Sequence, residues 1–250
     1  MKRSVACLLL ASGLALAACG SGAKDDPILR LSAEESLAEG RKLYEAEKFS
    51  QSRPYFQHAF EVEPNSAVGR EALLLVADAL YHQSGGGQLI QAEAKYRDFL
   101  NRFPTSDRAP YVQLQIARTL LRRMERPDRD QESTRKAQLA FEDLLRLYPT
   151  GEFTAEAQEG LSRVRSNLAE HEFLVARFYL RFGLPRAATT RLEALLEQYP
   201  DYLERDKALF HLALGYRRTE RKDAAQETVS KLRAEFPSSP WLRKIPKEMR

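Results

Sequence analysis

Cysteine is scarce in this chain, which contains only Cys7 and Cys19 in 250 residues. Neither lies in the body of the chain, so no disulfide can form there and the fold must be stable through packing alone. The four histidines, His58, His82, His171 and His211, are scattered and do not form the two-histidine, one-acid spacing of a zinc site. We therefore expect neither a metal nor another cofactor.

Signatures of catalysis and of nucleic-acid binding are missing as well. Gly85-Gly86-Gly87 is not followed by Lys-Ser or Lys-Thr, so it is not a phosphate-binding loop, and no serine sits in a nucleophile elbow. Adjacent acids such as Glu34-Glu35 face apart on a helix and do not make a catalytic pair. Basic and acidic residues are interspersed, and no basic block carries interleaved aromatics. The chain is therefore expected to be no enzyme and to bind no nucleic acid.

The N-terminus carries the pattern of a bacterial lipoprotein signal. A positive head with Lys2-Arg3 precedes an apolar run that closes with Leu16-Ala17-Ala18-Cys19. The run is too short for a stable transmembrane helix, which needs about 20 apolar residues. Residues 1–18 are predicted to be removed, leaving Cys19 with two or three acyl chains, an effectively permanent anchor at about 0.8 kcal/mol per buried methylene. Because Gly20 rather than an aspartate follows, we predict delivery to the outer membrane, on its periplasmic face.

The mature chain divides into a short tether and a helical body. Residues 19–31 carry Gly, Ser, Lys, Asp and Pro27 without periodicity, which is typical of a flexible linker after the lipidated cysteine. From Ser32 onward apolar residues recur at spacings of three and four, and no alternating run suggests a strand. The predicted fold class is all-α.

Five prolines mark the ends of similar segments. Twelve residues before each stands a small residue, eight before a large apolar residue, and five before another apolar residue. The prolines are Pro64, Pro104, Pro149, Pro200 and Pro237. The small residues twelve positions earlier are Ser52, Ala92, Ala137, Ala188 and Ala225, and the large apolar residues eight positions earlier are Phe56, Tyr96, Phe141, Leu192 and Val229. The apolar residues five positions earlier are Ala59, Phe99, Leu144, Leu195 and Leu232. This resembles the second helix of the tetratricopeptide repeat. We predict a solenoid of about five helix pairs over residues 32–250, with N-terminal repeats at 32–124 and C-terminal repeats at 125–240.

Insertions explain why these repeats are longer than the usual 34 residues. Ser84–Gly87 is predicted to expand one turn and Glu125–Glu132 another. Glu152–Arg181 contains no proline and is predicted to form one unusually long helix, which would project beyond its neighbours and offer a place for a partner to dock. Gly40 lies 24 residues before Pro64, where the repeat places a small residue for tight packing.

Candidate binding residues follow from this architecture, because repeat solenoids hold partners on a concave face lined by first helices. Tyr44, Tyr81 and Arg118 are candidates in the early repeats, since aromatic and arginine side chains dominate binding hot spots. Arg177 and Arg181 are four residues apart and would share one face of the long helix. The alternative for the tyrosines is that they pack between helices. The alternative for the arginines is that they are solvated.

The order of segments resembles the BamD family of outer-membrane protein assembly factors. The resemblance rests on Asp128-Arg129-Asp130, Ala137, Phe141, Leu144, Tyr148-Pro149, Leu168-Ala169, Glu172, Val175-Ala176, Tyr179, Gly183, Arg191 and Glu193, with the aromatic-proline endings Phe103-Pro104, Tyr199-Pro200 and Phe236-Pro237. It implies a non-catalytic scaffold lipoprotein of the β-barrel assembly machinery, working with other Bam lipoproteins.

The same resemblance implies two binding surfaces. The C-terminal repeats would dock on the last periplasmic POTRA domain of BamA through a surface around Glu172 to Arg191; its candidate residues are Glu172, Arg177, Arg181, Phe182 and Arg191. The N-terminal repeats, around Tyr44 to Tyr81, would capture the C-terminal strand signal of unfolded outer-membrane protein precursors. The competing interpretation is another lipidated repeat scaffold, for type IV pilus assembly or cell-envelope coordination, in which the run from Asp128 to Glu193 would not be expected.

Overall fold

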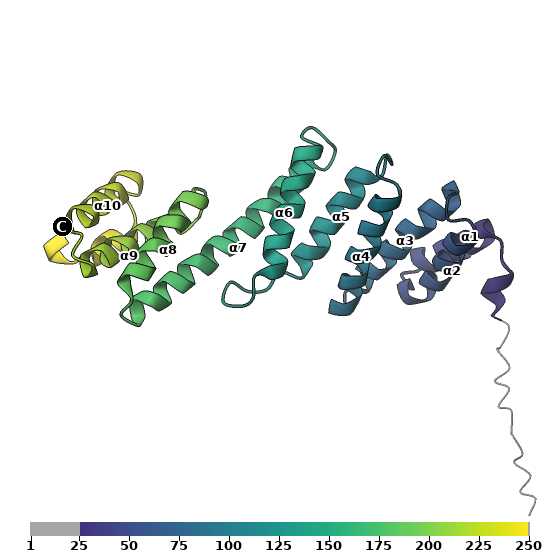
Figure 1. The fold of residues 1–250 in the computed structure, drawn as a ribbon, viewed down its shortest axis with the longest axis horizontal. Coiled ribbons are helices and arrows are strands. Elements are labelled where there is room, and N and C mark those ends of the chain that lie inside the picture. The colour runs from purple at the N-terminus through teal and green to yellow at the C-terminus, as the bar shows by residue number, and fades with distance from the viewer. Residues whose placement is uncertain (1–25, 250) are drawn as a thin grey trace, which may run out of the picture.

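The computed structural model describes residues 26–249, and within that range the chain is built from helices without a strand. The α-helices are α1 (Ala33–Glu45), α2 (Phe49–Val62), α3 (Ala67–Gln83), α4 (Gly86–Arg102), α5 (Ala109–Arg122), α6 (Glu132–Leu147), α7 (Thr154–Arg181), α8 (Pro185–Gln198), α9 (Arg205–Arg218) and α10 (Lys222–Glu235). Figure 1 shows them side by side in one elongated row. The all-α prediction is confirmed. The predicted signal peptide and Cys19 lie outside the described residues.

Consecutive helices pack as pairs, and the second helix of each pair stops just before its closing proline. The residues before the prolines leave the helix with φ between −136° and −124° and ψ between 59° and 68°, because proline disfavours the α conformation of the residue it follows. All fifteen residues predicted at the three offsets before the prolines are at most 2% exposed. The predicted close approach at Gly40 is also present, since a Cβ there would lie 2.6 Å from the Phe56 ring.

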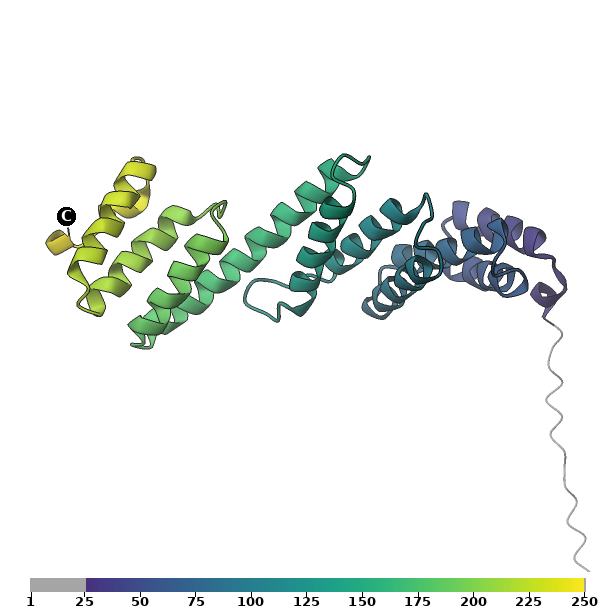
Figure 2. The same ribbon diagram turned by 45° about the horizontal axis from the view of Figure 1, so that its top comes forward.

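Helix α7 joins two hydrophobic cores. Its 28 residues span about 42 Å at 1.5 Å per residue, twice the length of the 14-residue α8. Leu168 belongs to the core of the first six helices, and Ala169 already belongs to the core of the last three. In Figures 1 and 2, α7 runs obliquely from the α5–α6 pair to α8. The predicted long helix is therefore present, and it links the two halves of the solenoid.

The two predicted insertions differ in how they are held. The loop between α5 and α6 lies on the middle of α7, where Asn167 Nδ2 donates to the Glu125 carbonyl at 3.0 Å and His171 Nδ1 lies 2.7 Å from the Pro127 carbonyl. The turn after α3 is shorter than expected. Only Ser84, with a left-handed φ of 66°, and Gly85 lie outside helices, since α4 begins at Gly86.

Both ends of the described chain are covered by short 3-10 helices. Pro27–Arg30 lies within the range expected to be a tether, yet it forms a helical turn capped by Asp26, and His58 Nε2 contacts the Leu31 carbonyl at 3.0 Å. At the other end, Pro240–Lys244 and Lys247–Met249 cover α9 and α10. Ile245 and Met249 are buried there. Among residues 26–249, no helix is both long and apolar enough to cross a bilayer.

Candidate partner-binding surfaces

The aromatic residues proposed for the early repeats are half-buried in a cluster of rings around His82. The Tyr44 ring lies 5.9 Å from the His82 ring, and the Tyr81 ring lies 5.5 Å from it. Burial raises the pKa of Tyr44 to about 12. The Arg122 guanidinium lies 4.6 Å from the centre of the Tyr81 ring, and its Nη1 donates to the Tyr81 carbonyl at 2.8 Å. The structure therefore places Tyr44 and Tyr81 in one cluster, where neighbouring side chains already cover part of each tyrosine.

Arg118 lies away from that aromatic cluster. It is on α5 and forms an ion pair with Glu156 near the start of α7. This contact fixes the first turn of α7 against the preceding helix pair. The Arg118 side chain is therefore already paired, and the structure does not place it with Tyr44 and Tyr81.

The residues proposed for the later repeats gather at the C-terminal end of α7. Arg181 and Phe182 are exposed, and Arg177 is exposed with its guanidinium 6.0 Å from the centre of the Phe173 ring. Arg191 Nη1 pairs with Glu172 Oε2 at 2.7 Å, which joins α8 to α7 and raises the pKa of Arg191 through that hydrogen bond. The structure thus brings all five predicted residues to α7, its end and the facing part of α8.

Exposed apolar side chains lie among these charges. Phe178 is 55% exposed and Phe182 61% exposed, and their ring centres are 4.4 Å apart. Leu184, 52% exposed, follows in the turn to α8. We name Phe178, Phe182 and Leu184, together with Arg177 and Arg181, the α7–α8 patch.

Gly183 explains how the turn presents Leu184. Its φ of 74° lies in the left-handed region, and the Leu184 N–H then donates to the Tyr179 carbonyl at 2.9 Å. This is a Schellman ending, which satisfies a free carbonyl at the helix terminus. This ending fixes the direction in which the backbone leaves α7, and with it the position of Leu184.

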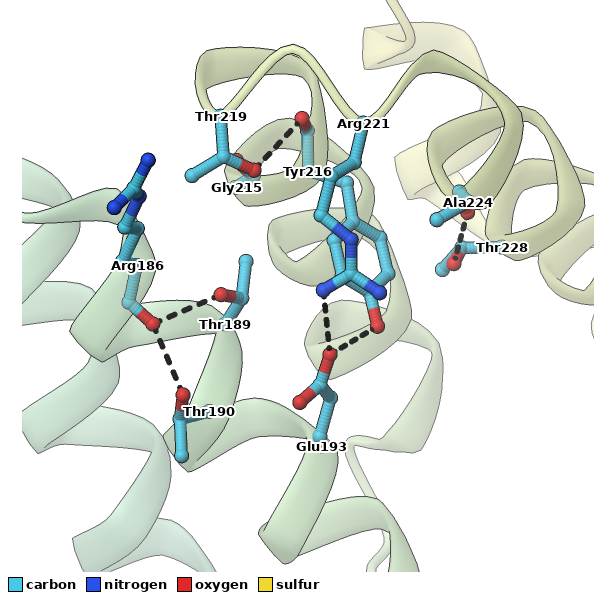
Figure 3. A network of polar contacts seen from close by, with 10 residues as sticks. All are labelled: Arg186, Thr189, Thr190, Glu193, Gly215, Tyr216, Thr219, Arg221, Ala224 and Thr228. Atoms are coloured by element: carbon cyan, nitrogen blue, oxygen red, sulfur yellow. Dashed lines mark hydrogen bonds and ion pairs between the residues drawn. The ribbon is translucent and has the colours of Figure 1, made fainter.

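A cavity of about 510 Å³ adjoins the patch, lined by residues of the turn, the start of α8 and the end of α9, among them Leu184, Arg186 and Arg218. Figure 3 shows the neighbouring network, in which the Arg186 carbonyl accepts from the Thr189 and Thr190 hydroxyls. The Arg186 guanidinium points away from that network. Arg218 donates to the Leu180 carbonyl at 2.7 Å. The cavity wall therefore carries two arginines and one acidic residue, Glu220.

The α8–α9–α10 framework beneath this wall is tied by Glu193. Its Oε1 accepts from the Tyr216 hydroxyl and, at 3.2 Å, from Arg221 Nη1 (Figure 3). Arg221 also lies over the Tyr216 ring, 4.4 Å from its centre. One carboxylate thus holds side chains from the end of α9 and the turn before α10.

A family model described as "YfiO: Outer membrane lipoprotein" matches residues 31–232, most of the chain. The chain belongs to this family. One curated relative is "Outer membrane protein assembly factor BamD" of Neisseria gonorrhoeae, which is 26% identical over 246 residues, covering 94% of this chain and 92% of the relative. The protein of the same name from Rickettsia prowazekii is 25% identical, covering 93% and 91%. The resemblance to BamD proteins is confirmed.

Among solved structures, the "TPR2AB-domain:pHSP90-complex of yeast Sti1" is 16% identical to this chain. The match covers 84% of this chain and 80% of the solved chain, with a TM-score of 0.44. Within residues 26–249, no group of three or more His, Cys, Asp or Glu side chains is placed to hold a metal ion.

Sequence analysis of this YfiO-family chain missed Phe178, Leu184 and Arg186. A signal for Phe178 is present, because the stretch from Arg177 to Phe182 repeats Arg-Phe at a spacing of four residues. That spacing places both pairs on one side of a helix. Leu184 and Arg186 carry no comparable pattern, since their exposure depends on how α8 folds back from the Gly183 turn.

Proposed function

We propose that the chain is a non-catalytic scaffold lipoprotein of the outer-membrane β-barrel assembly machinery. Cys19 would carry the lipid anchor, holding the solenoid on the periplasmic face of the outer membrane. The support is the family match over residues 31–232 and the BamD name of relatives that align over nearly the whole chain. The solenoid adds a long rigid body with separate N-terminal and C-terminal surfaces, which suits a protein that holds two partners at once.

The single structural observation behind the docking step is the α7–α8 patch. Large exposed apolar side chains on a soluble surface are typical of a protein-binding site, and aromatic residues and arginine dominate binding hot spots. Phe178 and Phe182 supply the first, and Arg177 and Arg181 directly precede them in the chain as exposed side chains. Arg186 lines the adjoining cavity. We propose that this patch docks on the periplasmic POTRA domain of a BamA-type subunit. The POTRA domain would contribute apolar residues flanked by carboxylates.

The N-terminal repeats would hold unfolded outer-membrane protein precursors, and other Bam lipoproteins would complete the assembly. Tyr44 and Tyr81 offer partly exposed ring surface at one edge of the first two helix pairs. Such a surface binds an extended chain weakly, because much of the binding free energy is spent on ordering the chain. Weak binding suits a step in which a precursor is handed on.

Co-purification tests the docking step. The detergent-solubilised lipoprotein is isolated as wild type, as an Arg177→Glu, Arg181→Glu variant, and as an Arg163→Glu, Arg233→Glu variant whose exposed arginines lie outside the patch. We expect BamA to be recovered with wild type and with the control, and to be lost with the patch variant. Recovery of pilus or secretin components in place of BamA contradicts the proposal and favours the pilus scaffold.

A further inference from the structure

The first turn of the described chain, Pro27–Arg30, forms a small cavity with α2. Its Asp26 cap accepts at Oδ1 from the Ile28 N–H at 3.0 Å, and the Leu31 carbonyl after the turn lies 3.0 Å from His58 Nε2. Figure 1 shows this turn at one end of the row of helices, beside α1 and α2. The cavity has a volume of about 270 Å³ and is lined by Asp26, Ile28, Leu29, Arg53, Pro54, Gln57, His58 and Glu61.

The α2 side of this cavity carries one positive and one negative side chain. Arg53, Gln57 and Glu61 follow one another at a spacing of four residues, which places them on one face of the helix. Arg53 forms no hydrogen bond or ion pair with another residue of the range 26–249. Gln57 Nε2 donates to Glu61 Oε1 at 2.9 Å, so the amide orients the carboxylate. The step from Arg53 to Glu61 is about 12 Å at 1.5 Å per residue, so the two long side chains can hold a small ligand that carries both charges.

Leu29 places an apolar side chain beside these charges. It is 66% exposed, more than Phe178, Phe182 or Leu184 of the α7–α8 patch. A single exposed leucine is common on soluble proteins, so its position relative to the membrane decides its meaning.

The lipid anchor would keep this turn close to the bilayer. Residues 20–25 separate Cys19 from Asp26. At no more than about 3.6 Å per residue, the path from Cys19 to Asp26 spans about 25 Å at most. Because the acyl chains of Cys19 would lie in the membrane, the cavity and Leu29 cannot move farther than this from the headgroups.

We propose that this cavity binds the headgroup of a membrane phospholipid that carries a phosphate and a primary ammonium. Arg53 would bind the phosphate, Glu61 would accept from the ammonium, and Leu29 would enter the boundary between headgroups and acyl chains. This contact would hold α1 and α2 against the membrane in one orientation, whereas the tether alone would let the solenoid swing. The proposal rests on the proposed lipid anchor at Cys19, which brings the turn to the bilayer.

Fluorescence quenching by labelled lipid tests this contact. The lipidated full chain carries Ser50→Cys, an exposed position on α2 three residues before Arg53, and this thiol would be the only free one once Cys19 is acylated. A fluorophore on it is quenched by a nitroxide on lipid headgroups only at near contact. The vesicles are either equal parts of phosphatidylethanolamine and phosphatidylcholine, or phosphatidylcholine alone, whose quaternary ammonium has no N–H to donate. We expect quenching to be at least twofold stronger in the mixed vesicles.

Variants in this background assign the contact to the cavity. Leu29→Ser and Arg53→Gln should each reduce quenching in the mixed vesicles at least twofold. Glu61→Gln should give the same quenching in both kinds of vesicle. The matched controls are Leu203→Ser, an 86% exposed leucine in the turn before α9, and Arg233→Gln, an exposed arginine on α10, and both should leave quenching unchanged.

Equal quenching in the two kinds of vesicle, or unchanged quenching in both Leu29→Ser and Arg53→Gln, overturns the proposal. Flotation of the same samples with the vesicles distinguishes this site from the anchor. A chain that does not float contradicts the lipid anchor and this proposal with it. A chain that floats while its quenching is the same in all variants contradicts the headgroup site alone.

Discussion

The burial of Asp78 makes the stability of the fold depend on pH. Burial raises the pKa of Asp78 from 3.8 to about 6, against the opposing effects of the Tyr96 and Tyr111 hydrogen bonds and of Arg108. A difference of about 2 in pKa corresponds to about 3 kcal/mol. Between pH 3.8 and 6 the folded chain binds a proton that the unfolded chain releases, so stability falls as pH rises through this window. Above pH 6 the ionised carboxylate lowers the stability by that full amount.

Asp78→Asn removes this penalty, because an amide oxygen can accept from both tyrosine hydroxyls without carrying charge. We expect the variant to be more stable than wild type by about 3 kcal/mol at pH 7.5. Near pH 3.5 the two should agree to within about 0.3 kcal/mol, because the aspartate is then protonated in the folded state and mostly protonated in the unfolded state. Asp78 lines a cavity of about 740 Å³ between α3, the end of α4 and the start of α5, so Asn Nδ2 would face this cavity and would not be buried without a partner.

Hydrogen exchange is the suitable assay, because it reports the opening of α3, α4 and α5 separately from the rest of the solenoid. Amides of α3, α4 and α5 are followed at the two pH values in both proteins. The expected result is greater protection of these three helices in Asp78→Asn at pH 7.5 only. Lower protection than wild type at pH 7.5, or greater protection that persists at pH 3.5, would show that the buried charge of Asp78 does not set the stability of these helices.

Three further predictions concern the framework. Gly160→Ala should lower the free energy of unfolding by about 1–3 kcal/mol in urea titrations, although alanine favours helix, because its methyl group would overlap the buried ring of Phe141. Arg165→Ala should increase hydrogen exchange at the α8–α9 turn, since Arg165 pairs with Asp201 at 2.9 Å. Glu47→Gly should raise the melting temperature, because Glu47 has a left-handed φ of 57° and glycine relieves roughly 1 kcal/mol there.

The repeat architecture was predictable because its signals are local. A closing proline acts on the residue before it, and the offsets of five, eight and twelve residues lie within one helix, so Phe56 and Ala59 show their roles without any knowledge of distant parts of the chain. The long α7 was predictable for the same reason, from the absence of proline between Glu152 and Arg181. The turn at Glu47 was hidden, because a glutamate there gives no sign of the left-handed conformation.

The cavity at Asp78 was not predictable from the sequence. Its two hydrogen-bond donors lie 18 and 33 residues further along the chain, on other helices. Arg108 reaches the cavity only through the turn that follows Pro104. One local signal existed, since Asp78 interrupts the apolar run of Ala77, Ala79 and Leu80, and a charge inside such a run is a candidate for a buried functional group.

The affinity of the purified POTRA domain for this chain tests whether the α7–α8 patch docks on a BamA-type subunit. The comparison is between wild type and Phe178→Ala, Phe182→Ala, with Leu139→Ala, an exposed leucine on α6, as the matched control. We predict that the double variant binds about 30-fold or more weakly, as for the loss of a hot spot worth about 2 kcal/mol, and that the control binds as wild type. Equal affinity of all three proteins would show that the α7–α8 patch does not bind this domain.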